Sequence, residues 1–187
     1  MRPPLSQIRG FVQRFLNFPD DLSWSELDKQ GVKLPVRMKF VDLVIERDKD
    51  ILLVEIKDPS HSRSKDKDRN AYLKRLSDNS ILTQELTPKA RDSYLYLHLM
   101  ERDHKPFKYV VLLGLDAFAP GVQKGLLGPF KGRLLADIRE ESFEAWKRRH
   151  IADCMVLSVE SWNKYFPDWP LRREAPAEAM VPEGVAQ

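Results

Sequence analysis

Three charged side chains stand at interior positions of the two buried strands that the stretch FVDLVIERDKDILLVEIKD, residues 40–58, predicts. They are Asp42, Glu55 and Lys57. A charge is costly in an apolar environment, so residues of these types at these positions need a chemical reason. Two carboxylates beside a lysine can hold a divalent cation and neutralise charge that develops in a reaction.

The predicted hairpin would bring the three charges to one face. With residues 48–49 at the centre of the turn, Asp42 lies directly opposite Glu55. Lys57 points from the same face, because side chains alternate along a strand. Directly opposed side chains start only about 5 Å apart at Cβ. The other face then carries apolar side chains, namely Val41, Leu43, Ile45, Leu52, Val54 and Ile56.

Two carboxylates held so close in a partly dry site repel each other unless a cation lies between them. Oxygen ligands favour Mg²⁺ (or Mn²⁺) over zinc. Such an ion can polarise a phosphoryl oxygen and activate a water, which suits phosphodiester hydrolysis. In the simpler alternative, Lys57 forms an ordinary cross-strand ion pair with Asp42 or Glu55 on a solvent-facing hairpin. The register, the apolar embedding and the shared face together favour the metal site.

The pattern resembles the PD-(D/E)XK nuclease superfamily, in which an Asp on the second core strand precedes (D/E)-x-K on the third. Here the matching residues are Asp42 and the run Glu55-Ile56-Lys57, while Val41 replaces the proline of the motif. The resemblance covers roughly residues 22–116. It implies that Asp42 and Glu55 bind the metal, that the Ile56 backbone carbonyl adds a ligand, and that Lys57 assists the attacking water.

Members of this superfamily often carry a further acid on a preceding helix, and Glu26 is the candidate here. The run DDLSWSELDKQG predicts a short helix, with Ser23 and Glu26 as a capping box and Gly31 at its end. A capping role is the alternative function of Glu26.

Basic residues follow the hairpin in a hydrophilic excursion at residues 58–80. They could track a nucleic-acid backbone, although interleaved Asp residues make an ordinary solvated face the alternative. The nucleic-acid candidates from this stretch are Lys65, Lys67 and Arg69, with Arg63, Lys74 and Arg75 nearby.

A second basic pair begins the next predicted helix, which runs from Thr87, as N-cap, to about Asp103. Lys89 and Arg91 would oppose the helix dipole there, so a phosphate could be their partner. Pairing of these two residues with Glu85 or Asp92 is an equally good explanation.

The remaining pattern predicts a single α/β domain over residues 1–170, with a mixed central β-sheet flanked by helices and a restriction-endonuclease-like core. Residues 171–187 predict a disordered tail. The expected elements are an amphipathic helix at 5–18, strands at 37–46 and 50–57, a strand at 108–116, a partly helical segment at 119–132, a helix at 137–150, a strand at 152–159 and a helix at 160–166.

The composition limits the number of domains and the classes of function, but it does not identify a function. The 187 residues suit one well-buried domain, and a net charge of +3 is too small to identify nucleic acid as the partner. Cys154 is the only cysteine, which excludes an intrachain disulfide and a Cys-based zinc site. No signal-peptide core or membrane-spanning run is visible, so we expect a cytoplasmic protein that does not bind a membrane.

The sequence therefore predicts a Mg²⁺-dependent nuclease that acts on DNA rather than RNA. The alternative is a non-catalytic nuclease-like module that binds nucleic acid or a protein partner in a larger defence or repair complex. The resemblance also allows a homodimer. A nucleotide-binding or metabolic enzyme ranks lower, because the chain lacks a glycine-rich phosphate loop.

Overall fold

A five-stranded mixed sheet forms the centre of the computed structural model, which describes residues 18, 21–28, 35, 37–60, 66–116, 118–141, 144 and 146–171. The strands lie side by side in chain order. They are β1 (Ser23–Glu26), β2 (Leu43–Glu46), β3 (Ile51–Lys57), β4 (Phe107–Leu113) and β5 (Asp153–Leu157). The predicted α/β class with a mixed central sheet and flanking helices is confirmed.

The sheet combines an antiparallel meander with two parallel strands. β1, β2 and β3 pair antiparallel in sequence, whereas β4 is parallel to β3 and β5 is parallel to β4. In the hairpin, Leu43 faces Val54 and Glu46 faces Ile51, which is the register expected for a turn centred on residues 48–49. The parallel crossovers between β3 and β4 and between β4 and β5 are filled by helices, as parallel pairing requires.

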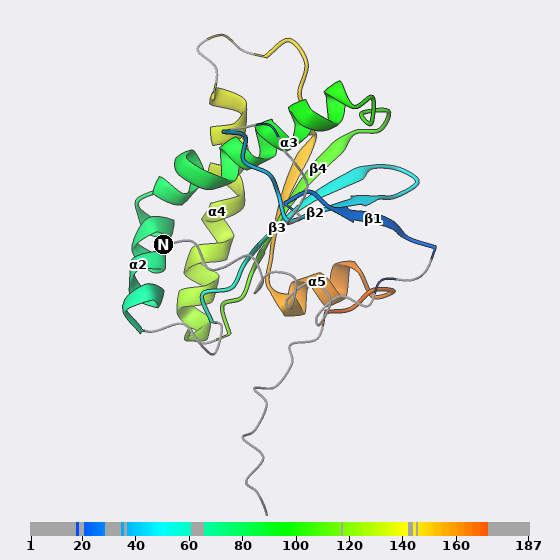
Figure 1. Ribbon diagram of the computed structural model, residues 1–187. Coiled ribbons are helices and arrows are strands. Elements are labelled where there is room, and N and C mark those ends of the chain that lie inside the picture. Colours follow the sequence, from blue (N-terminus) through cyan, green and yellow to red (C-terminus); the bar gives the residue numbers. More distant parts are fainter. Residues whose placement is uncertain are drawn as a thin grey trace, which may run out of the picture.

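Helices cover both faces of this sheet (Figure 1). On one side lie α2 (Asp66–Ser77), the π-helix η1 (Leu82–Leu86), α3 (Thr87–Leu99) and α4 (Pro120–Glu140). The short helix α5 (Val159–Tyr165) lies on the other side. No helix within the described ranges is long and apolar enough to cross a membrane.

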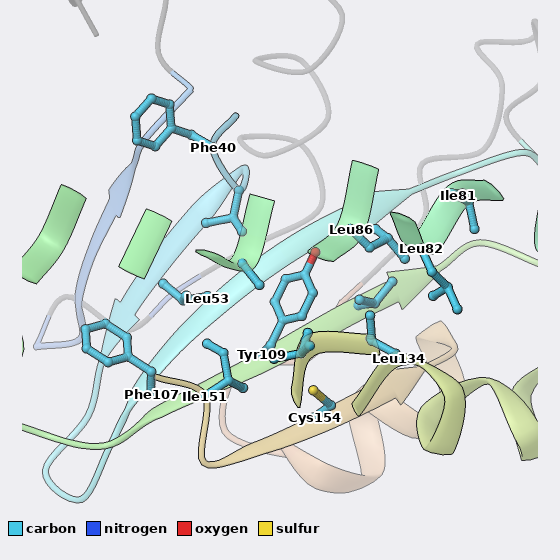
Figure 2. Close-up of a cluster of buried hydrophobic side chains, with 14 of the residues drawn as sticks. Phe40, Leu53, Ile81, Leu82, Leu86, Phe107, Tyr109, Leu134, Ile151 and Cys154 are labelled. Atoms are coloured by element: carbon cyan, nitrogen blue, oxygen red, sulfur yellow. The ribbon is translucent and has the colours of Figure 1, made fainter. Parts of the chain in front are cut away.

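Each face of the sheet has its own apolar cluster, the first on the face of α3 and α4 and the second on the face of α5. On the face of α3 and α4, Leu53 and Tyr109 pack with Leu86 and Leu134 (Figure 2). The opposite face packs against Trp162 and its aromatic neighbours in and after α5.

The predicted apolar face of the hairpin is largely correct. The second cluster contains Leu43, Ile45, Leu52 and Val54, with Ile56 packed against it. The prediction for Val41 is wrong, because this residue belongs to the first cluster. Residues 41–42 precede β2, and Asp42 lies in a bend, so the strand's alternation does not extend back to Val41.

The helix expected around Ser23 and Glu26 is instead the edge strand β1, paired with β2 from Ser23–Glu46 to Glu26–Leu43. Backbone pairing with an existing hairpin outweighs a local capping signal of about 1 kcal/mol. Tertiary contacts therefore determine that this segment is a strand rather than a helix.

Helix α4 is continuous from Pro120 to Glu140, although the sequence predicts a partly helical segment at 119–132 and a separate helix from residue 137. Its buried residues Phe130, Leu134 and Ile138 recur every four positions and cross the expected boundary at residue 137. A continuous apolar stripe stabilises one long helix. The helix expected over 137–150 is therefore wrong beyond Glu140, and the described residues among 141–150 are not helical.

Thr87 is not the N-cap of a new helix. The backbone is already helical through Ile81 and η1, and the Thr87 hydroxyl donates a hydrogen bond to Asp137 at 2.5 Å. The expected free helix end beside Lys89 is therefore wrong. The helix predicted at 5–18, apart from Phe18, and the tail after Leu171 lie outside the described residues.

The buried hydroxyl of Tyr109 allows a test of how the first apolar cluster contributes to stability. Tyr109 is fully buried, and its hydroxyl oxygen has no hydrogen-bond partner among the described residues. We expect Tyr109→Phe to leave the free energy of unfolding unchanged or to raise it by about 1 kcal/mol, because a buried unpaired hydroxyl is unfavourable.

Urea unfolding of Tyr109→Phe and Tyr109→Ala would test this expectation. The alanine variant should lose roughly 3–5 kcal/mol through cavity formation. A loss of similar size in Tyr109→Phe would show that the hydroxyl is engaged in a stabilising contact.

Candidate metal centre

Asp42 lies where the hairpin ladder ends. The last backbone pair is Leu43–Val54, and the Asp42 carboxylate reaches across to β3, where its Oδ2 accepts a hydrogen bond of 2.7 Å from the Ile56 N–H. Its side chain is nearly buried, at 5% exposure. Glu55 is the residue that faces this position if the ladder is continued by one pair, as expected.

Helix α3 fixes the backbone that leads into Asp42. The Lys39 N–H donates to Asp92 Oδ2 at 2.8 Å, and the Val41 N–H donates to Ser93 Oγ at 3.0 Å. These side chains accept the backbone hydrogen bonds that a neighbouring strand would otherwise accept, because the segment before β2 is not part of the sheet. The position of Asp42 therefore depends on α3 as well as on β3.

Glu55 is fully buried and is bound by two ammonium groups. Lys89 Nζ lies 2.7 Å from Glu55 Oε1 and 2.8 Å from Oε2. Lys57 Nζ lies 2.9 Å from Glu55 Oε1. Lys57 and Glu55 thus share a face, as the alternation predicted, and Lys89 joins them from α3.

Glu85 is a third acid of the cluster, which the sequence predicts only as a partner for Lys89 or Arg91. Its Oε2 lies 2.9 Å from Lys57 Nζ, and its Oε1 lies 2.8 Å from Arg75 Nη2. The charges therefore alternate from Lys89 through Glu55, Lys57 and Glu85 to Arg75.

The alternation arises because charged residues on the helix and on the strand are separated by nearly the same distance. Glu85 and Lys89 are four residues apart along η1 and α3, which is about 6 Å. Glu55 and Lys57 are two residues apart along β3, which is about 6.6 Å. An E-x-x-x-K helix segment can therefore lay opposite charges on an E-x-K strand, and this complementarity was the available sequence signal for Glu85.

Tyr72 on α2 is a further neighbour that sequence reasoning missed. Its hydroxyl oxygen is buried without a hydrogen-bond partner among the described residues. Burial raises its pKa, and the charges of Lys57 and Glu85 act on it. No sequence pattern distinguished Tyr72 from the other tyrosines.

The environment of Asp42 favours its protonated form when no metal is bound. Burial and the negative charge of Glu55 raise its pKa from 3.8 to about 7, although Lys89, Lys57 and the Ile56 N–H oppose the shift. Burial makes the larger contribution, and repulsion between two carboxylates in a partly dry site adds to it.

Lys57 and Glu85 stay charged at neutral pH. Burial opposes the charged form of Lys57, but the charges of Glu55 and Glu85 outweigh it and raise the lysine pKa far above its ordinary value. Burial likewise opposes ionisation of Glu85, yet Lys57 and Arg75 hold its pKa at about 2.

The donor atoms near Asp42 fit a hard divalent cation. Lys57 O accepts a hydrogen bond of 2.8 Å from Gly114 N on the β4 side, so the preceding carbonyl, that of Ile56, is directed to the other edge of β3, where Asp42 lies. Two carboxylates and a carbonyl suit Mg²⁺, which usually keeps several waters. The part of the chain that the structure describes contains no group of three or more His, Cys, Asp or Glu residues placed to hold a metal.

Other predicted site residues are not brought into this cluster. Glu26 pairs with Leu43 and so points to the opposite face of the sheet from Glu55. Arg91 pairs with Asp92 at 2.8 Å and also with Glu141.

The basic candidates of the excursion have different positions. Lys67 is exposed on α2, and Arg69 pairs with Asp66 at 3.0 Å. Lys65 lies outside the described residues. Cys154, predicted to be a structural thiol, is fully buried on β5, and burial raises its pKa to about 12.

The chain matches no family model, no curated protein and no solved structure.

The raised pKa of Asp42 predicts a pH-dependent stability of the metal-free protein. Between pH 3.8 and about 7, the folded state holds a proton that the unfolded state has released, so the free energy of unfolding falls as pH rises through this window. Asp42→Asn cannot titrate. Its stability relative to the wild type should therefore rise by on the order of 4 kcal/mol between acidic and mildly alkaline pH.

Urea unfolding of both proteins with a chelator present, at several pH values across the window, measures this difference. A pH-independent difference between wild type and Asp42→Asn would mean that Asp42 titrates normally.

Proposed function

We propose that this protein is a metal-dependent nuclease with a restriction-endonuclease-like core, which hydrolyses phosphodiester bonds in DNA. The observation that carries the proposal is the convergence of buried Asp42 and Glu55 at one end of the hairpin, with Lys57 in contact with Glu55. A buried acid with a strongly raised pKa, as Asp42 has, is typical of functional sites.

The order of elements supports the resemblance to PD-(D/E)XK nucleases. Asp42 directly precedes the second strand of the sheet, and Glu55 and Lys57 lie on the third. A helical segment and a strand parallel to β3 follow. The hairpin, the following helix and the following strand thus agree with the order that the resemblance implies, whereas β1 stands where a helix was expected.

Asp42, Glu55 and the Ile56 carbonyl would hold a Mg²⁺ or Mn²⁺ ion. When bound, such an ion polarises a phosphoryl oxygen and lowers the pKa of a coordinated water. The buried position of both carboxylates keeps bulk water from screening their interaction with the ion and the substrate.

Lys57 would act as a fixed cation in this reaction. In the metal-free protein its raised pKa keeps it protonated at neutral pH, so it can donate hydrogen bonds and stabilise negative charge. The contact of Lys57 with Glu85 holds the ammonium in place beside Glu55.

The nucleic-acid backbone would meet basic residues of α2 and α3. Lys67 is exposed at the start of α2, and Lys89 reaches the cluster from α3. Lysines contact phosphates without regard to sequence, so these residues would support backbone binding rather than base recognition. Lys65 and Arg69 extend the same basic stretch in the sequence.

A non-catalytic nuclease-like module is the second candidate. Both oxygens of Glu55 already contact Lys89, and Glu85 is likewise paired, so these acids are neutralised within the chain. Such a module would bind nucleic acid or a protein partner within a defence or repair complex and would use the cluster only for stability.

Cleavage assays with single- and double-stranded DNA and with RNA separate the two candidates. We expect DNA cleavage that depends on Mg²⁺ or Mn²⁺ and that falls at least about a hundredfold in Asp42→Asn and Glu55→Gln, because each loses a charged metal ligand. Glu46→Gln, on the same hairpin but paired with Arg102, is the matched control and should cleave like the wild type.

Circular dichroism shows whether each variant is folded. Metal-stimulated cleavage that persists in folded Asp42→Asn and Glu55→Gln would refute this metal centre. If the wild type binds no metal by calorimetry and cleaves no substrate, the non-catalytic candidate is favoured.

A further inference from the structure

Lys89 occupies Glu55 in the manner of a bound metal ion. Its Nζ contacts both carboxylate oxygens, at 2.7 and 2.8 Å, so the positive charge lies astride the carboxylate. A divalent cation that used Glu55 would need at least one of the same oxygens at about 2.0–2.1 Å. A metal that takes the place of the ammonium between the two oxygens must displace it, because two cations cannot occupy one location.

The second ammonium on Glu55 is more firmly held. Lys57 contacts only Oε1 of Glu55 and is also bound to Glu85 at 2.9 Å. If a metal takes over Glu55, Lys57 keeps an anionic partner. Both contacts described for Lys89 in this cluster are with Glu55, so Lys89 is the cation that a metal would displace.

Lys89 also has a route out of the cluster. Its side chain is 16% exposed, whereas that of Glu55 is completely buried. A lysine has four flexible methylene groups and a strongly hydrated ammonium, which makes movement toward solvent inexpensive compared with leaving a buried acid unpaired.

We propose that Lys89 is an exchangeable counter-ion that neutralises Glu55 in the metal-free protein and leaves it when a divalent cation binds. This inference rests on the proposed metal centre. It adds that metal binding is a competition with an internal cation. It also gives Lys89 two successive positions, on Glu55 and then at the solvent-facing edge of the cluster.

Calorimetric titration with Mn²⁺ tests the exchange. Removing the competitor in Lys89→Met should tighten Mn²⁺ binding by roughly tenfold, within the usual range for coupling between two ligands. Lys89→Arg keeps a cation on Glu55 and should not show this gain.

Lys108→Met is the matched control. Lys108 pairs with another buried acid, Asp50, at 2.8 Å and lies on β4, beside the opposite end of β3. Its removal changes the net charge equally, so a gain confined to Lys89→Met excludes a general electrostatic effect.

The outcomes separate the exchange from the metal centre itself. Binding that is equal or weaker in Lys89→Met, but lost in Asp42→Ala and Glu55→Ala, overturns the exchange and leaves the metal centre standing. Absence of binding in both the wild type and Lys89→Met at millimolar Mn²⁺ overturns both. Binding detectable only in Lys89→Met is the strongest form of the expected result.

Competitive acetylation of the wild type gives a second readout that needs no variant. Mass spectrometry should show that saturating Mn²⁺ increases the modification rate of Lys89 severalfold, while the rates of Lys57 and Lys108 stay constant. A Lys89 rate that does not change while calorimetry reports bound Mn²⁺ overturns the exchange.

Discussion

The buried carboxylate of Glu55 is the constraint on which the rest of the site depends. An ionised group without exposure to water is tolerated only when it is paired. A single lysine from the same strand would leave one oxygen unpaired, and Lys89 supplies the second cation. The docking of α3 over β3 is therefore an electrostatic requirement as well as a consequence of apolar packing.

That docking also determines the backbone around Asp42. Ser93 and Asp92 lie just after Lys89 on α3, and they accept hydrogen bonds from the segment that precedes β2. One helix thus pairs Glu55 and holds the approach to the other acid. The π-helix immediately before Thr87 has the wider turn that often accompanies functional sites, and it carries Glu85 to Lys57.

The hairpin and its charged face were predictable because they depend on a period of two and on a turn, both of which are local in the sequence. The parallel strand β4 was equally visible as a continuous apolar run. By contrast, β1 is a strand only because β2 offers it a partner, and α4 is continuous because its stripe faces the sheet. The partners of Glu85 and Lys89 could not be assigned from the sequence, since each depends on which strand residue lies beneath the helix.

A metal centre and a purely structural ion cluster place different demands on Asp42. The alternating ion pairs from Lys89 to Arg75 are complete without it, and Asp42 adds a buried acid whose pKa is raised to about 7. That acid destabilises the metal-free fold above neutral pH, although it accepts a hydrogen bond from the Ile56 N–H. A divalent cation would reverse the balance, because its two charges can replace one proton on Asp42 and one ammonium on Glu55. This charge balance supports the metal centre proposed above.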